Sequence, residues 1–402
     1  MGTNKPYKHH IPFPSGPFAT GCIELMTEYS AEGCFARIFY PTDISSNKLN
    51  EYSDKWIPWI PDETYLKGFA ECLRIPFCIF KYGPSIIRLK PYYIPTIFEA
   101  QPSKTLKSFP IFIFSHGFGA TRFVNSEYCN SLASHGFFVV AIEHRDTSSP
   151  ATFYYDSPES AKNDNRTWVN HVQFHKIIGP DHYYQRNKQL KYRFKEMKKI
   201  IDTIFKINSG EVVDNVFNPN FDLLQFKNKL DVDNIVGSGF SFGGATAMYT
   251  AANDKRIKSL VIVDGWMFSL KSEPNLSIEQ SILFINTHTF HLESNIAIIK
   301  KYMASNSFRQ LYTLKNTTHE SPTDTAYIWG HWLDLFMIKK MNSETALRLQ
   351  SSLTLRYLND RMNYPENVDG LQIYIKEHSD KIVSDTIKYS KRVKRKMGIW
   401  FW

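Results

Sequence analysis

Short apolar runs alternate with helical stretches from residue 109 onward, and this alternation limits the fold more than any other feature of the sequence. Fully apolar strands separated by helices are typical of a parallel sheet that helices cover on both faces. We therefore predict an α/β protein with a doubly wound, mostly parallel sheet. The expected strands span 109–114, 136–142, about 234 to the turn around 241, 257–263, 281–285 and 309–314, and the expected helices span 124–134, 184–207, 245–252 and 323–340.

The first third of the chain looks irregular and is rich in Pro and aromatic residues. No internal repeat or low-complexity linker divides the sequence. A chain of 402 residues is long enough to bury a sizeable core. We expect residues 1–365 to form a single α/β domain and residues 366–402 to form a C-terminal extension with a basic and aromatic tail.

Charge and cysteine usage narrow the classes of partner. The formal net charge is +9, and much of the excess lies in residues 388–396. Basic proteins often bind nucleic acid or anionic membranes, but no RNP-like, zinc-finger or helix-turn-helix pattern is present, so we expect no nucleic acid. The five cysteines are odd in number and form no CxxC pair, which predicts reduced thiols. We expect no metal and no cofactor.

Residues Gly239–Gly243 (GFSFG) match the pattern G-x-S-x-G. In this pattern a serine lies on a sharp turn between a strand and a helix, and the flanking positions must lack side chains to avoid collisions. The following helix directs its N-terminal amides toward a developing negative charge. Here the pentapeptide follows an apolar strand and precedes helix-forming residues, so we predict that Ser241 is a nucleophile. The alternative is an inert serine in a Gly-rich turn.

An acid and a base follow the serine in the chain order expected of this kind of site. Asp264 ends the apolar run 257–263, where a buried carboxylate needs a partner. His319 follows the last expected strand. We predict that His319 takes the serine proton and that Asp264 fixes the imidazole tautomer. The alternatives are a turn or cap aspartate and an ordinary loop histidine.

A His-Gly pair follows the first expected strand, in the segment Phe114–Gly119 (FSHGFG). Such a pair is typical of the oxyanion loop of lipases and esterases. We predict that the backbone N–H groups of Phe118 and of Phe242, the residue after the serine, stabilise the oxyanion. A Gly-rich turn without a catalytic role is the alternative.

Together these segments resemble the platelet-activating factor acetylhydrolases, the plasma and intracellular type II group, which are also counted among the phospholipases A2. The resemblance implies an α/β-hydrolase fold and a calcium-independent serine esterase. Such an enzyme hydrolyses the sn-2 acetyl or oxidised acyl ester of platelet-activating-factor-like phospholipids through an acyl-enzyme. The resemblance also implies that Ser241, Asp264 and His319 form the catalytic triad and that the backbone N–H groups of Phe118 and Phe242 bind the oxyanion. The matching segments are 16–22, 37–41, 114–122, 132–146, 239–246 and 264–268, within a similarity that runs from about 12 to 360.

Three departures from the family pattern stand out. The family elbow usually has His before the serine, where this chain has Phe240, so we expect the chemistry to survive and the acyl pocket to differ. The base region at 318–320 matches only loosely, and the segment after about 365 has no counterpart.

The segment His144–Asp146 (HRD) imitates the catalytic loop of protein kinases. That loop needs Asn five residues after its Asp, and position 151 is Ala. We interpret the segment as a structural ion-pair cluster at the end of a strand.

Three segments favour contact with a lipid surface. Residues 65–82 and 327–341 place apolar side chains at helical spacing, and residues 391–402 join five cations to aromatic residues. Core packing and a solubilising tail are the alternatives. No apolar run is long enough to span a bilayer, and the N-terminus lacks a secretory signal. We therefore expect a cytoplasmic protein that associates peripherally with membranes and takes phospholipid as substrate.

Other functions stay open at this point. A general carboxylesterase or lipase of the same fold would share every motif above. A non-catalytic hydrolase-fold binding protein is less consistent with an intact elbow, acid and base. A peptidase of this fold is also conceivable, although no propeller-like repeats precede the motifs. Oligomeric state and the limits of acyl length do not follow from the sequence.

Overall fold

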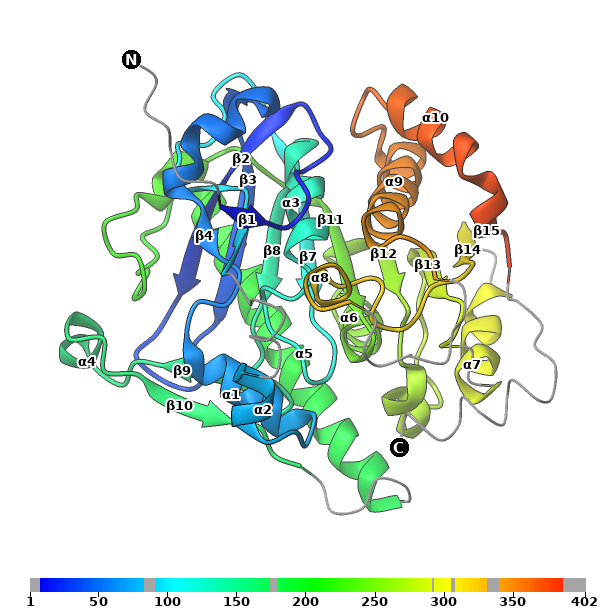
Figure 1. Ribbon diagram of the computed structural model, residues 1–402, viewed down its shortest axis with the longest axis horizontal. Coiled ribbons are helices and arrows are strands. Elements are labelled where there is room, and N and C mark those ends of the chain that lie inside the picture. The colour runs from blue at the N-terminus through cyan, green and yellow to red at the C-terminus, as the bar shows by residue number, and fades with distance from the viewer. Residues whose placement is uncertain are drawn as a thin grey trace.

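A ten-stranded sheet runs through the centre of the computed structural model, and helices pack on both of its faces (Figure 1). The structure describes residues 8–82, 91–173, 180–290, 293–304, 308–330 and 340–385. The strand order in the sheet is β15-β14-β13-β12-β11-β7-β8-β3-β2-β6. The strands of this sheet are β2 (Phe18–Met26), β3 (Phe35–Ser45), β6 (Ile97–Phe98), β7 (Phe109–Ser115), β8 (Phe138–Ile142), β11 (Leu230–Phe240), β12 (Ile257–Val263), β13 (Ser281–Thr287), β14 (Arg309–Leu314) and β15 (Ile382–Val383).

The six strands from β8 to β14 in this order are parallel to one another, as the sequence predicts. Because successive side chains of a strand point to opposite faces, each strand contributes side chains to two hydrophobic cores, one on each face of the sheet. Phe112 and Phe114 of β7 pack in one core with α3, α9 and α1. Ile111 and Ile113 pack in the other with α5, α6 and α7. Apolar residues on both faces explain why these strands read as continuous apolar runs.

The structure confirms the predicted helices where the apolar periodicity is clear, and the observed helices differ from the prediction elsewhere. The expected helix at 323–340 ends early, at Ile328, because Gly330 adopts a φ of +76° that breaks the helix; residues 331–339 lie outside the described part. The helices are α1 (Glu63–Cys72), α2 (Phe77–Tyr82), α3 (Ser126–Ser134), α4 (Pro158–Lys162), α5 (Pro180–Ser209), α6 (Phe242–Asn253), α7 (Glu293–Met303), α8 (Asp324–Ile328), α9 (Ser343–Met362) and α10 (Asp369–Glu377), with 3₁₀ turns η1 (Ser46–Lys55), η3 (Leu223–Phe226), η4 (Met267–Ser272) and η5 (Ser379–Lys381).

The first third of the chain is more regular than expected. Strands β2 and β3 are antiparallel to each other, and β3 is antiparallel to β8. Their buried positions include Glu24 and Arg37, whose charged side chains form a 2.5 Å ion pair. Charged residues at buried positions hide the apolar pattern by which strands are recognised. The remaining short strands are β1 (His9–His10), β4 (Ile57–Pro58) and β5 (Tyr92–Ile94) in a three-stranded sheet, and the hairpin β9 (Ala151–Tyr154) and β10 (Thr167–Asn170).

The described part of the C-terminal segment joins the main body. Leu371 and Ile375 of α10 pack into the core of the α3 face. Strand β15 pairs antiparallel with β14 at the edge of the sheet. The domain boundary expected between residues 365 and 366 stays a prediction. None of the described helices is both long and apolar enough to cross a bilayer.

Candidate active site

Ser241 lies in the tight turn between β11 and α6. Its backbone has φ 55° and ψ −117°, a region that costs a non-glycine residue about 1–3 kcal/mol. Two main-chain bonds hold the turn: the Ser241 N–H donates to the Val263 carbonyl at 3.0 Å, and its carbonyl accepts from the Trp266 N–H at 2.8 Å. The strained turn places the hydroxyl at the carboxyl edge of the sheet, where ligands of such folds bind.

The two glycines of the motif are required by close main-chain contacts. A Cβ atom on Gly239 would lie 2.2 Å from the carbonyl group of Gly243. A Cβ atom on Gly243 would lie 1.8 Å from the carbonyl oxygen of Ser115. Because both neighbours are backbone atoms, no side-chain movement could relieve the overlap. The spacing G-x-S-x-G is therefore a packing requirement of this turn.

His319 and Asp264 meet the serine in one chain of hydrogen bonds. His319 Nε2 lies 3.0 Å from Ser241 Oγ, and His319 Nδ1 lies 2.6 Å from Asp264 Oδ2. Thr287, at the end of β13, donates to both Asp264 oxygens, from its N–H at 2.7 Å and from its hydroxyl at 2.6 Å. An ionised carboxylate only accepts, so Nδ1 carries the proton and Nε2 is left to accept from the serine.

Two aromatic rings enclose the imidazole. The ring of Phe290 stacks on His319 at 3.9 Å between centroids and 22° between planes. The ring of Phe240 stacks on it at 4.8 Å and 29°. Phe290 and Thr287 were not among the site residues predicted from the sequence. The position of Thr287, at the end of the strand beside Asp264, is a signal that could have identified it.

The loop after β7 lies against the serine. A Cβ atom on Gly117 would lie 3.1 Å from Ser241 Cβ, so Phe118 follows a residue that touches the nucleophile turn. Phe242 is the first residue of α6, whose opening N–H groups lack partners within the helix. Both predicted oxyanion residues thus adjoin Ser241. The Phe118 side chain is 39% exposed and packs against His171 and the Arg186 guanidinium.

The sequence matches the family described as platelet-activating factor acetylhydrolase, isoform II, over residues 3–382. This chain belongs to that family. The platelet-activating factor acetylhydrolase of Cavia porcellus is 32% identical over 365 residues, which cover 89% of this chain and 79% of that protein. The acetylhydrolase of Gallus gallus is 30% identical over 401 residues, covering 96% and 91%.

Similarity to solved structures supports the fold. A ferulic acid esterase from Streptomyces cinnamoneus superimposes with a TM-score of 0.59 at 14% identity, covering 88% of this chain and 91% of that one. At this identity the likeness concerns the fold alone, and it confirms the expected α/β-hydrolase architecture.

Across the residues that the structure describes, no group of three or more His, Cys, Asp or Glu side chains could hold a metal ion. The five cysteines are free thiols, of which Cys22, Cys34 and Cys129 are buried.

Proposed function

We propose that this acetylhydrolase-family chain is a serine esterase. Its substrate is the sn-2 acetyl or short oxidised acyl ester of a platelet-activating-factor-like phospholipid. The observation that carries the proposal is the unbroken hydrogen-bonded series from Asp264 through His319 to Ser241. Family membership supplies the substrate class, since the relatives at 30–32% identity are named platelet-activating factor acetylhydrolases.

The first half-reaction forms an acyl-enzyme. Ser241 Oγ attacks the ester carbonyl carbon while its proton passes to His319 Nε2, and the carbonyl oxygen becomes an oxyanion. The N–H groups of Phe118 and Phe242 bind that oxyanion. When the intermediate collapses, the bond to the glycerol oxygen breaks, and that oxygen takes the proton from the imidazolium to leave as lysophospholipid.

The second half-reaction restores the enzyme. Water gives a proton to His319 Nε2 as its oxygen attacks the acyl carbonyl of the Ser241 ester. Collapse of the second tetrahedral intermediate releases the carboxylic acid and returns the proton to Ser241 Oγ. Asp264 stays ionised throughout and stabilises the imidazolium.

An acyl-length series tests this function. Wild type and Ser241→Ala are incubated with phosphatidylcholines that carry acetyl, oxidised short or long sn-2 chains, with and without EDTA. We expect release of short chains by wild type alone, at the same rate in EDTA, because every proposed step uses groups of the chain itself. Equal release by both proteins would overturn the nucleophile. Similar rates for short and long chains would instead favour a general lipase.

We also propose that the protein works at a membrane surface. Tyr65 and Phe69 of α1 are buried in the core, so the apolar face of this helix is not available to lipid. Leu73, which follows α1, is 39% exposed and is available for such contact. Most of the second segment, at 331–339, and the tail at 388–402 lie outside the described residues. The cytoplasmic location stays a prediction.

A further inference from the structure

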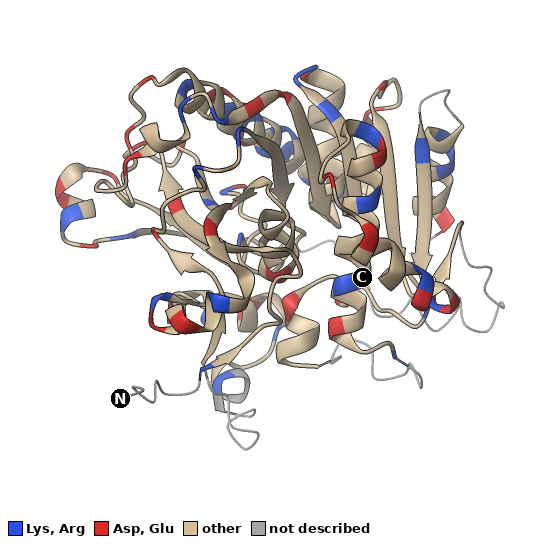
Figure 2. Ribbon diagram, turned by 90° about the horizontal axis from the view of Figure 1, so that it is seen from above, with Lys and Arg blue, Asp and Glu red and all other residues tan. Residues whose placement is uncertain are grey.

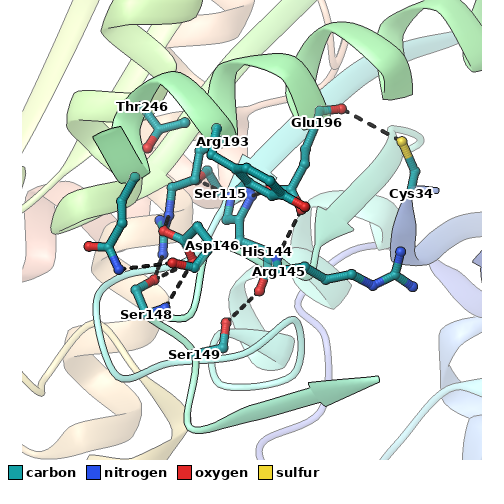
Figure 3. A network of polar contacts seen from close by, with 12 residues as sticks. Cys34, Ser115, His144, Arg145, Asp146, Ser148, Ser149, Arg193, Glu196 and Thr246 are labelled. Carbon is teal, nitrogen blue, oxygen red and sulfur yellow. Dashed lines mark hydrogen bonds and ion pairs between the residues drawn. The ribbon is translucent and has the colours of Figure 1, made fainter. Parts of the chain in front are cut away.

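The aspartate of the HRD segment forms a fully buried ion pair. Asp146 Oδ2 lies 2.7 Å from Arg193 Nε on α5, and both side chains are wholly inaccessible to solvent (Figure 3). This contact confirms the interpretation of the segment as a structural ion-pair cluster. Burying two charges is costly unless further hydrogen bonds satisfy them. The other hydrogen bonds of Arg193 therefore indicate which part of the structure the ion pair stabilises.

The Nη1 and Nη2 donors of Arg193 bind the loop after β7, which lies beside Ser241. Arg193 Nη1 donates to the His116 carbonyl at 2.7 Å, and Nη2 donates to Ser148 Oγ at 2.6 Å. Nη2 also lies 3.5 Å from the Gly117 carbonyl oxygen. The guanidinium carbon sits 4.4 Å from the centre of the Phe242 ring. One side chain thus contacts both segments that supply the predicted oxyanion amides.

The contacts of the Gly117 carbonyl determine the direction in which the Phe118 N–H points. The Gly117 carbonyl faces Arg193 Nη2 and accepts from His116 Nδ1 at 2.8 Å. In a planar trans peptide the carbonyl and the following N–H point in opposite directions. The Phe118 N–H therefore points away from Arg193 and His116, and its peptide begins at Gly117, which touches Ser241.

The surroundings of Asp146 and His116 keep the first side chain ionised and the second neutral. Burial would raise the pKa of Asp146, but the charge of Arg193, the neighbouring His144 and the hydrogen bonds from Ser148 and Arg193 together outweigh it and lower the pKa to about 2. Burial also lowers the pKa of His116 well below its usual value, so the ring is neutral. Its Nε2 faces the backbone N–H of His144 at 3.1 Å and must accept, so the proton sits on Nδ1, which faces Gly117.

The far side of the loop is fixed by the same pair. Asp146 Oδ1 accepts from the Ser148 N–H at 3.1 Å and from its hydroxyl at 2.7 Å. The Ser148 carbonyl in turn accepts from the Gly119 N–H at 3.0 Å. Phe118 therefore lies between two residues, Gly117 and Gly119, that both contact this network.

We propose that Arg193 is a positioning residue that sets both oxyanion donors, aiming the Phe118 amide through the 116–117 carbonyls and bracing α6 through the Phe242 ring. This inference rests on the proposed esterase function. Arg193 acts through these donors and does not touch the substrate. Its effect should therefore appear where negative charge develops on the carbonyl oxygen, and should be small where the substrate is still uncharged.

The test compares Arg193→Lys with wild type on a soluble acetyl ester, p-nitrophenyl acetate. Lysine keeps the charge beside Asp146, but a compact ammonium cannot reach the carbonyls and Ser148 together. Removing one oxyanion donor costs about 10²–10³ in kcat, so misdirecting it should lower kcat about 10- to 100-fold. We expect KM to change by less than about threefold, and the affinity for a trifluoromethyl ketone, which forms an oxyanion adduct, to fall in step with kcat/KM.

Two further variants separate positioning from folding. Ser148→Ala removes one contact of Arg193 and leaves the ion pair intact, so it should lower kcat and ketone affinity together by a smaller factor. Arg37→Lys disturbs another buried arginine, which pairs with Glu24 in the outer strands. It should lower the melting temperature while kcat stays at the wild-type value.

The outcomes are distinct. Wild-type kcat in both Arg193→Lys and Ser148→Ala would overturn the proposal. So would a fall in kcat without a matching loss of ketone affinity, or an equal fall in Arg37→Lys. Failure of the esterase function itself is recognised separately, because wild type and Ser241→Ala would then show the same rate before any positioning variant is measured.

Discussion

His319 is held on its edge and on both faces. Asp264 binds Nδ1, while Phe240 and Phe290 stack on the two sides of the ring. Aromatic faces attract cations by about 0.5–2 kcal/mol, so the two rings favour the imidazolium that the proposed mechanism forms. They also restrict rotation of the ring away from Ser241. The departure from the family pattern at Phe240 thus affects the environment of the base and leaves the triad residues unchanged.

The carboxylate of Asp264 is tested by Asp264→Asn. An amide NH₂ at the Oδ1 position would face the Thr287 N–H, which cannot accept, so it favours the Oδ2 position, where the Thr287 hydroxyl can accept and where it faces His319 Nδ1. The imidazole then loses its favoured tautomer. We expect kcat to fall by about 10⁴ with the fold retained. Steady-state kinetics and a thermal melt measure the two effects. A loss of less than tenfold in a folded variant would contradict the role of Asp264.

The sequence predicts the residues of the Asp264–His319–Ser241 hydrogen-bonded series better than it predicts the residues that pack around them. Ser241, Asp264 and His319 follow a chain order and lie at strand ends, which are local signals. Phe290 and Arg193 reach the site through contacts between distant segments. A phenylalanine in a loop or an arginine in a charged helix carries no local sequence signal. Such residues become visible only when the fold brings the segments together.

At the scale of elements, strands with apolar residues on both faces were predicted closely, and elements with buried polar residues were not. Strand β12 has the predicted bounds, Ile257–Val263. Helix α9 was not predicted, because its buried positions include polar residues such as Gln350 and Ser351. In β2 and β3 buried charges have the same effect. Periodicity identifies an element only where burial and apolarity coincide.

Helix α3 is tied to the loop that carries the base. The Asp324 carboxylate accepts from the N–H groups of Ser126 and Glu127 at 2.8 and 3.1 Å, and from the Trp59 indole at 2.9 Å. Asp324 begins α8, just after the turn that holds His319. The cap therefore fixes this turn against the body of the protein.

Stability should depend on pH through Glu127 in this helix. Burial raises its pKa from 4.5 to about 7. Because the folded-state pKa is above the unfolded value, the acid favours the fold at low pH and loses that effect as the pH rises from 4.5 through 7. The loss amounts to a few kcal/mol in the free energy of unfolding, at about 1.4 kcal/mol per pKa unit.

Glu127→Gln isolates this effect. Glutamine can still accept the Ser131 hydrogen bond that Glu127 Oε1 accepts at 2.8 Å, but it does not ionise. Urea unfolding at pH 5 and pH 8 should show a smaller fall in stability for the variant than for wild type. The same fall in both proteins would assign the pH dependence to other groups.

At the scale of the whole molecule, charge is spread over the surface. Lysine and arginine are interspersed with acidic residues on the outer helices and loops, while the sheet is largely free of charge (Figure 2). The strong basic cluster of the sequence lies in residues 388–402, outside the described part. We therefore expect the proposed membrane contact to depend chiefly on this tail, at about 1 kcal/mol per cation near an anionic surface.

Vesicle pelleting tests this assignment. Deletion of residues 388–402 should weaken binding to anionic vesicles, and Leu73→Asp should weaken it further by removing an exposed apolar contact next to α1. Ile373→Asp is the matched control, since Ile373 is 58% exposed on α10, at the opposite end of the molecule from α1 (Figure 1). All three variants should hydrolyse a soluble ester at the wild-type rate. Undiminished pelleting of the deletion variant would contradict a role of residues 388–402 in binding anionic lipid.

The central claim is that the hydroxyl of Ser241 accepts the acyl group, and rapid-quench mass spectrometry tests it most directly. Wild type is mixed with excess 2-acetyl phospholipid, quenched within one turnover and digested. The account predicts a transient peptide that contains Ser241 and carries one added acetyl group, absent from Ser241→Ala. Release of acetate by wild type with no acetylated Ser241 peptide at any quench time, or with the acetyl group on another residue, would contradict it.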